Sequence, residues 1–275
     1  MLRCPLISSL AIVLCCGPIG WAHNDLEERI EAATEAIDRE PGNPTGYLER
    51  GDLYRQHQQW AEALSDFEHA RGLAPDLPIV DLDRGMTFAD AGRHLDAVAA
   101  FDAFLFRAPD EARGLAGRAR SQRALGRLPE AALDYAALER VVVEPDPQMY
   151  LDWCACAADD QSRLAVIARG LARLGSVASL EDMAVRLETA TGRTDAALAR
   201  IDRLIAASAR PEGWWLRRGE LLQACHRDDE ARTAFAAGMA ALELVPSHRR
   251  ATDASLAIAR GLQAGLEATP LERKP

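Results

Sequence analysis

The sequence predicts an all-α protein, built as a right-handed superhelical solenoid of antiparallel helix pairs. A period of 34 residues runs through the first half of the chain, and each period holds two stretches with apolar residues at helical spacing. A proline closes each period, because proline cannot continue a helix. The residues that keep the period are Gly51, Gly85 and Ala119; Arg50, Arg84 and Arg118; Ala63, Ala97 and Ala131; Phe67, Phe101 and Tyr135; and Pro41, Pro75 and Pro109.

The first 22 residues are typical of a secretory signal peptide. Arg3 provides a positive start, an apolar run covers residues 6–16, and a small-x-small site ends at Ala22. The run is too short to span a membrane comfortably. We therefore expect cleavage near Ala22 and a periplasmic or secreted protein. The alternative is a lipid anchor at Cys15 or Cys16.

Residues 23–41 predict a leading helix that forms half a repeat. Asn24 is a suitable helix start, and apolar residues between Leu26 and Ile37 lie on one stripe. Pro41 is in register with the prolines that close the later units.

Three full repeats follow, and each is expected to be a helix pair. In the first, an apolar set between Tyr47 and Tyr54 has helical spacing, residues 56–59 form a polar break, and a second apolar set runs from Trp60 to Leu73. Turns with glycine replace the polar break in the next two repeats, since glycine suits the left-handed end of a helix. The expected bounds are 44–77, 78–111 and 112–145.

The pattern weakens after the third repeat and then returns. Two degenerate repeats are expected at 147–178 and 179–210, and a sixth repeat at 212–246 restores the small and aromatic positions. A last amphipathic helix at 248–267 is expected to cap the array with a polar outer face.

The small residues that keep the period have a packing role. A glycine on the first helix and an alanine on the second are expected where two helices cross closely, and an aromatic side chain fills the space toward the next unit. One helix pair cannot bury both of its helices, so stacked neighbours must provide the core. The expected packing residues are Gly51, Gly85, Ala119, Gly219, Ala63, Ala97, Ala131, Phe67, Phe101 and Tyr135.

These units resemble the tetratricopeptide repeat family. The residues that carry the resemblance are Tyr47, Arg50, Gly51 and Tyr54 on the first helix, and Ala63, Phe67, Ala70 and Pro75 on the second. The resemblance covers most of the chain after the leader. It implies that the first helices line a concave groove, and that this groove binds a protein or peptide segment.

The first helices therefore supply the candidate contacts with a partner. Arginine is suited to bidentate capture of carboxylates, so three arginines of the third repeat are expected to hold an acidic stretch or a chain terminus. Asp83 lies on the same expected surface. Trp214 is a candidate anchor, because its neighbour Trp215 takes the packing position. The candidate contacts are Arg113, Arg120, Arg123, Leu48, Asp52, Leu82, Met86 and Trp214.

Composition and motifs narrow the function. The formal net charge of −10 argues against nucleic acid or an anionic membrane as the main partner. No metalloprotease, phosphate-loop or nucleophile-elbow motif is present, so we expect no enzyme and no cofactor. His23 would be the amino terminus after cleavage, and a terminal amine with an imidazole can chelate copper. A copper carrier is therefore a less favoured hypothesis.

Three cysteines follow the leader, at Cys154, Cys156 and Cys225. Cysteine without a disulfide is often interior, so we expect small buried side chains at these positions. Because an exported protein meets an oxidising compartment, a disulfide or a redox-active thiol stays open as an alternative.

The sequence thus predicts a non-enzymatic protein-binding scaffold of the bacterial cell envelope, which captures a partner segment in the concave groove. The alternative is an assembly or regulatory subunit of an envelope complex that uses its convex face or its ends. The partner and the oligomeric state stay open.

Overall fold

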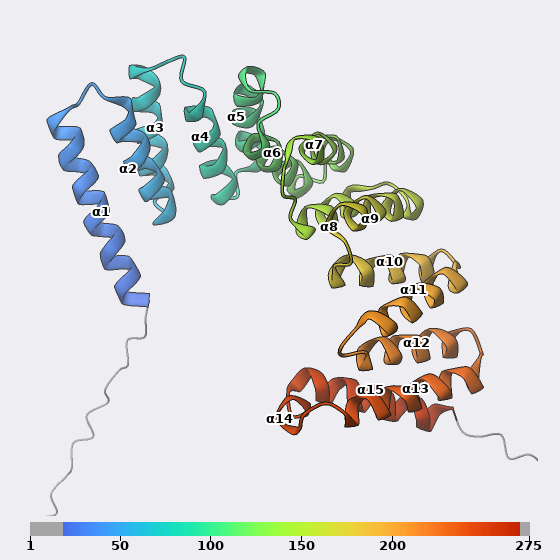
Figure 1. Cartoon of the computed structure of the whole chain (residues 1–275). Helices are drawn as coiled ribbons and strands as arrows, with labels where there is room; N and C mark the ends of the chain where they lie inside the picture. Colours follow the sequence, from blue (N-terminus) through green and yellow to red (C-terminus); the bar gives the residue numbers. More distant parts are fainter. Residues whose placement is uncertain (1–18, 270–275) are drawn as a thin grey trace, which may run out of the picture. The chain divides into compact units, whose positions relative to one another are not determined.

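The computed structural model describes residues 19–269 of the chain, with side chains from Asp25 onward. Within these residues every regular element is a helix, and consecutive helices pair antiparallel (Figure 1). The prediction of an all-α array of helix pairs is confirmed. Residues 1–18, which make up most of the predicted leader, lie outside the described part. The chain divides into two compact units, one up to Val143 and one from Glu144.

Unit 1 contains a leading helix followed by three helix pairs. In each pair the two helices pack against each other, and the second helix also packs against the first helix of the next pair. The helices are α1 (Ile19–Arg39), α2 (Pro44–Gln56), α3 (Trp60–Leu73), α4 (Ile79–Asp90), α5 (His94–Arg107), α6 (Ala112–Ala124) and α7 (Leu128–Val141). Helix α1 begins at Ile19, so the expected start at Asn24 is wrong.

Unit 2 repeats this arrangement and ends on a single long helix. Helix α15 packs on both helices of the preceding pair, α12 and α13, and so covers the end of the stack. The helices are α8 (Pro147–Cys156), α9 (Asp160–Leu174), α10 (Ala178–Ala190), α11 (Thr194–Ala207), α12 (Glu212–Ala224), α13 (Asp228–Glu243), α14 (Ser247–Arg250) and α15 (Asp253–Ala268).

The turn inside several helix pairs depends on one residue in the left-handed region. Gly92, Gly126 and Gly192 have φ values of +74°, +75° and +72°, which cost glycine nothing. Gln58 and His226 take the same place with φ values of +60° and +57°. These two turns therefore carry a backbone strain that the glycine turns avoid.

The core of unit 1 is built from aromatic rings that lie against glycine. Phe101 of α5 is fully buried. A methyl group at Gly85 of α4 would lie 2.7 Å from the Phe101 ring, and one at Gly117 of α6 would overlap the same ring. Phe101 therefore joins its own repeat to the next one, and both first helices approach it because they lack a side chain there.

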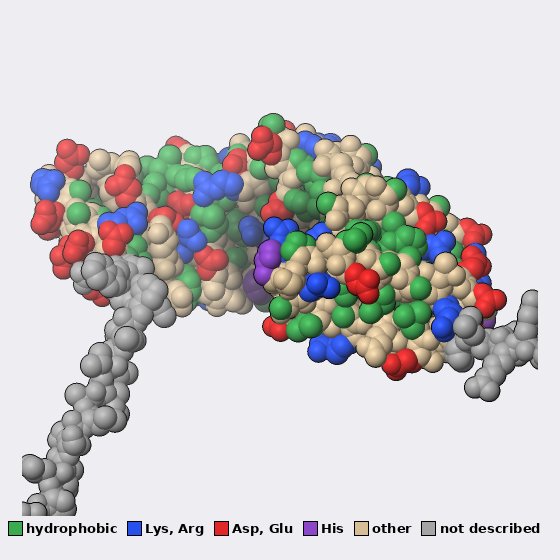
Figure 2. Space-filling view, turned by 60° about the horizontal axis from the view of Figure 1, so that its bottom comes forward, with side chains coloured by type: hydrophobic (Ala, Val, Ile, Leu, Met, Phe, Trp, Pro, Cys, Tyr) green, Lys and Arg blue, Asp and Glu red, His purple; other side chains and the backbone are tan. Residues whose placement is uncertain are grey.

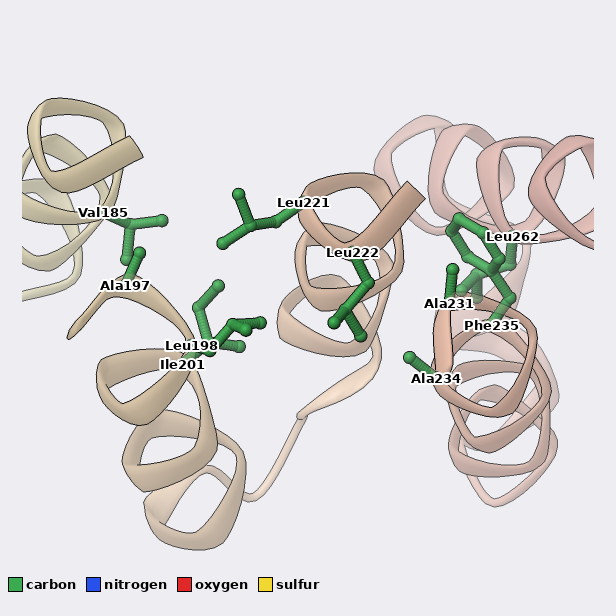
Figure 3. Packing of buried hydrophobic residues seen from close by; sticks show 10 residues of the cluster. All are labelled: Val185, Ala197, Leu198, Ile201, Leu221, Leu222, Ala231, Ala234, Phe235 and Leu262. Atoms are coloured by element: carbon green, nitrogen blue, oxygen red, sulfur yellow. The ribbon is translucent and has the colours of Figure 1, made fainter. Parts of the chain in front are cut away.

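Unit 2 has a core of the same design. Figure 3 shows side chains of α10, α11 and α12 converging on one side, and Phe235 of α13 lying beside Leu262 of α15. A methyl group at Gly265 would lie 2.5 Å from the Phe235 ring, and one at Gly219 would overlap that ring. The capping helix thus closes on Phe235 as a further first helix would.

The arginines that keep the period hold neighbouring helices together. Arg118 of α6 donates to Asp134 of α7 through Nε at 2.8 Å and through Nη2 at 2.7 Å, and Nη1 donates to Asp102 of α5 at 2.7 Å. Arg50 makes the same bidentate contact with Asp66, at 2.8 Å for both bonds. Each bond joins residues sixteen apart in the sequence. It therefore links the first helix of a pair either to the second helix of the same pair or to the second helix of the preceding pair.

Gly117→Ala is expected to lower the free energy of unfolding by about 1–3 kcal/mol, because the new methyl group overpacks the Phe101 ring. The measurement is urea unfolding followed by far-ultraviolet circular dichroism. Gly72→Ala is the matched control: nothing lies within 4 Å of the added group, and alanine favours helix by about 0.5 kcal/mol or more. The two substitutions should therefore change stability in opposite directions. Equal effects would contradict the packing role of Gly117.

Candidate functional site

A groove of about 590 Å³ is lined by the leading helix α1 and by α2 and α4, the first helices of their pairs in unit 1. We call it the N-terminal groove. Helix α1 contributes small residues, and α2 and α4 contribute apolar and acidic ones. Its lining residues are Arg29, Ala32, Ala33, Ala36, Leu48, Glu49, Asp52, Leu53, Ile79 and Asp83.

Helical spacing explains why these side chains meet. Leu48 and Asp52 are four residues apart on α2, and Ile79 and Asp83 are four apart on α4, so each pair faces one side of its helix. Helix α1 presents three alanines to the same space, and their short side chains leave it open. The result is an apolar floor with carboxylates beside it.

The carboxylate of Asp52 is already held within its own helix. Arg55 donates to Asp52 Oδ1 at 2.7 Å, and Gln56 donates to Oδ2 at 2.7 Å. Arg55 also donates to Asp90 of α4 at 2.7 Å. Arg55 therefore links α2 to α4, and its charge is divided between two carboxylates.

The side chain of Asp83 is different. It is 9% exposed, and no other residue of the described part donates a hydrogen bond or forms an ion pair with its carboxylate. Burial raises the pKa of Asp83 to about 6; the charge of Arg113 acts in the opposite direction, Asp52 adds to the rise, and Arg55 opposes it. Asp83 is thus a carboxylate held in the groove without a partner.

The three arginines expected to bind a partner all lie on α6 and are exposed. Arg113 extends toward α4, where its Nη2 lies 3.6 Å from the sulfur of Met86. Arg120 donates from Nε to the carbonyl of Ala116 at 3.2 Å. Because α6 packs against α4, unit 1 carries a basic strip on α6 beside the helix that bears Asp83.

Leu82 corrects one of the sequence expectations. It stands 34 residues after Leu48, yet it is only 1% exposed, whereas Leu48 is half-buried and lines the groove. Helix α4 packs against α6 as well as α5, which encloses this side of α4. Leu82 is therefore a core residue and cannot contact a partner.

Trp214 lines a second groove, of about 520 Å³, in unit 2. Helices α10, α12 and α15 form it, with Arg217 beside Trp214 and Ile258 facing them from the capping helix. At one end lies Glu212, which is 2% exposed and accepts hydrogen bonds from Arg210 Nε and Nη2 at 2.8 and 2.6 Å. Trp214 also packs on the core of unit 2, so it belongs to both surfaces.

Sequence reasoning missed Ile79 of α4 and what α1 and α15 bring to these grooves. The alanines of α1 line the first groove with Ile79, and Ser255 and Ile258 of α15 line the second. A usable signal was the alanine spacing of α1 at positions 32, 33 and 36, which marks a narrow face of small residues.

Three further features of the described residues concern metal ions, cysteines and membranes. They contain no group of three or more histidine, cysteine or acidic residues that could hold a metal ion. The side chain of His23 lies outside the described side chains. Cys154 and Cys156 are buried, Cys225 is half-buried, and all three are free thiols, which corrects the open alternative of a disulfide among them. No described helix is long and apolar enough to cross a bilayer.

Figure 2 shows acidic, basic and hydrophobic side chains interleaved over the face in view. On such a surface, recognition depends on local grooves and on the few charges that stand at them rather than on one broad charged field. The N-terminal groove and the α6 strip are therefore the features of unit 1 that suit a partner segment.

Comparison with known proteins agrees with this architecture. A tetratricopeptide repeat family model matches residues 20–78 and 82–149. Tetratricopeptide repeat protein 28 of Mus musculus is 34% identical over 93 residues, which are 34% of this chain and 4% of that protein. The chain thus spans a small fraction of the length of this curated relative, and the same holds for the relative from Homo sapiens.

Solved structures show the same fold. The C-terminal part of a TPR repeat-containing protein from Cytophaga hutchinsonii matches with a TM-score of 0.64 at 15% identity, over 86% of this chain and 96% of that one. A tetratricopeptide repeat protein from Parabacteroides merdae matches with a TM-score of 0.50 at 17% identity, over 90% of this chain and 94% of that one. At these identities the likeness concerns the fold alone.

Proposed function

We propose, on the premise that this chain carries tetratricopeptide repeats, that it is a non-enzymatic scaffold that captures a segment of a partner protein on the first helices of unit 1. The observation that carries this proposal is the N-terminal groove, which joins an apolar floor to charged walls. Its walls are helices fixed by the core. Capture of an extended or helical segment therefore costs the scaffold little ordering entropy.

The α6 strip gives the partner a second point of attachment. Arg113, Arg120 and Arg123 are exposed and project from one helix, and guanidinium groups bind carboxylates in bidentate geometry. An acidic stretch or a chain terminus of the partner would lie along α6, while the neighbouring part of the segment enters the N-terminal groove.

The setting of this function is the bacterial cell envelope. The support comes from the first 22 residues, with their positive start, apolar run and small-x-small site. Cleavage near Ala22 releases the scaffold into the periplasm or the medium. A lipid anchor at Cys15 or Cys16 is the alternative and would leave the scaffold at a membrane surface.

Arg120→Glu is expected to abolish capture of the partner by the tagged full-length chain, because it reverses a charge at the centre of the α6 strip. The measurement is an affinity pull-down from the envelope fraction, with amino-terminal sequencing of the recovered chain to locate the cleavage site. Arg203→Glu on α11 is the matched control, since Arg203 is also an exposed helical arginine. Intact capture by the Arg120 variant, with unchanged circular dichroism, would contradict the proposal.

A second candidate function uses the opposite helices. Phe106 of α5 is 90% exposed and Leu133 of α7 is 72% exposed, and both are second helices of their pairs. Exposed apolar side chains mark protein contacts where they gather in a contiguous patch. An assembly or regulatory subunit would use this surface. Crosslinks from the captured partner to α5 and α7, with none to α6, would favour this candidate over groove capture.

A further inference from the structure

We propose that the N-terminal groove takes one lysine or arginine side chain of the captured segment, with its charged head at Asp83 and its aliphatic stem along Leu48 and Ile79. This inference rests on the proposed function and specifies the chemistry of the partner. The segment would carry a basic residue for the groove beside the acidic stretch for α6.

The first support is the isolation of the Asp83 carboxylate. Asp83 lines the groove, is nine-tenths buried, and is given no hydrogen bond or ion pair by any other residue of the described part. A largely buried charged group without a hydrogen-bond donor is costly, because it loses much of its hydration and no direct contact replaces it. A donor supplied by a ligand would remove that cost.

The second support is the charge around Asp83. Glu49 and Asp52 share the groove with it, and Arg29 is the cation in the lining. On α2, Arg55 is engaged by Asp52 and Asp90, at 2.7 Å in each case. These groups leave the groove acidic.

One cation from a neighbouring helix acts on the same carboxylate. Arg113 of α6 lowers the pKa of Asp83, but its guanidinium is exposed and its Nη2 lies against the sulfur of Met86. An exposed arginine is screened by solvent and does not neutralise a buried carboxylate. A second cation, delivered along the groove, is therefore complementary to it.

The third support is the floor of the groove. Leu48, Leu53 and Ile79 make this floor aliphatic, and the alanines of α1 leave the groove open. Lysine and arginine carry three or four methylene groups behind their charge and cover apolar surface in this way. The groove thus matches both parts of a long basic side chain, whereas a compact ion would leave the apolar floor exposed.

The proposal has a definite dependence on pH. The carboxylate of Asp83 has a pKa of about 6, above its usual value, because burial disfavours its charge. It is ionised above this pH and neutral below it. A cationic side chain is therefore held at pH 7.5 and released as the pH falls through about 6, while a neutral apolar side chain would bind equally at both.

The test uses the full-length chain and a phage-displayed library of random heptapeptides, selected at pH 7.5. We expect lysine or arginine to be enriched at one position. A selected peptide should bind Asp83→Asn about 10- to 100-fold more weakly, which corresponds to the loss of a charge-assisted hydrogen bond. Replacing its basic residue by norleucine should weaken binding to the same extent.

Glu130→Gln is the matched control, because Glu130 is an exposed acid on α7 and its loss changes the net charge equally. Binding to this variant should stay unchanged, and binding to the unaltered chain at pH 5 should fall as it does for Asp83→Asn. Circular dichroism of each variant verifies folding. Binding is measured by fluorescence anisotropy of the labelled peptide.

Other outcomes separate this inference from the proposed function. Leu48→Arg blocks the groove. Peptides that lose binding to this variant, but carry no preferred basic residue and bind Asp83→Asn normally, would overturn the inference alone. Selected peptides that ignore Leu48→Arg but lose binding to Arg120→Glu would likewise overturn the inference alone. Selected peptides that ignore both substitutions, or a library without binders, would overturn both. Dimerisation in sedimentation that disappears in Asp83→Asn would assign the groove to a second copy of the chain and would also overturn the inference.

Discussion

Phe101→Ala is expected to lower the free energy of unfolding by about 3–5 kcal/mol, the usual range for removal of a fully buried aromatic side chain. The loss falls at the upper end of the range for a physical reason. Gly85 and Gly117 lie against the ring, since a methyl group at either position would meet it. As glycines, they have no side chains with which to fill the vacated space. The cavity therefore persists between two repeats rather than collapsing.

Guanidinium unfolding measured by circular dichroism gives this free energy. The matched control is Phe106→Ala on the same helix, since Phe106 is 90% exposed and its truncation should change stability by less than about 0.5 kcal/mol. Similar losses for the two variants would show that Phe101 does not join the second and third repeats.

Asp83→Asn is expected to raise the free energy of unfolding at pH 7.5 by about 1–3 kcal/mol, even though it removes the proposed ligand contact. The carboxylate titrates near 3.8 in the unfolded chain and near 6 in the folded one. Between these values the folded state holds the extra proton, so stability falls as the pH rises through this window and stays lower above it. Asparagine has no charge to desolvate.

The sign of this effect provides the check. At about pH 3 the Asp83 carboxyl is largely protonated in both the folded and the unfolded chain. The variant and the unaltered chain should therefore have nearly equal melting temperatures at that pH, and these should diverge as the pH approaches 7.5. Glu130→Gln should show no such divergence. A variant that is less stable than the unaltered chain at pH 7.5 would mean that Asp83 has a stabilising partner, which would remove the main support for its role in binding.

The fold could be predicted because its packing residues repeat. Gly51 and Gly85 recur with Phe67 and Phe101 at one spacing, and each ring meets the glycine of its own pair in the structure. Such contacts arise within one helix pair, where the distance along the sequence fixes the geometry. The helix pairs that keep this period could therefore be located from it.

The candidate site was less predictable, because it depends on how near the next helix comes. Leu48 and Leu82 occupy equivalent places in their repeats, but one lines the groove and the other is buried. Periodicity assigned a face to Asp83 but could not show that its carboxylate is left without a partner. That property follows from the engagement of Arg55 by Asp52 and Asp90, which involves two helices.

The arginine contacts have a consequence for how the chain unfolds. Arg118 holds carboxylates on both α5 and α7, so melting of either repeat strips a charged partner from the other, and the two should come apart in one cooperative step. Arg84 forms an ion pair with Glu68 of the preceding helix. Position 100, where an acid on α5 would complete the contact, is alanine, and the buried Nε of Arg84 has no partner in the described part. Within its own pair, α4 and α5 therefore lack the electrostatic coupling that ties α6 to α7, so within unit 1 we expect α4 and α5 to separate more readily than α6 and α7.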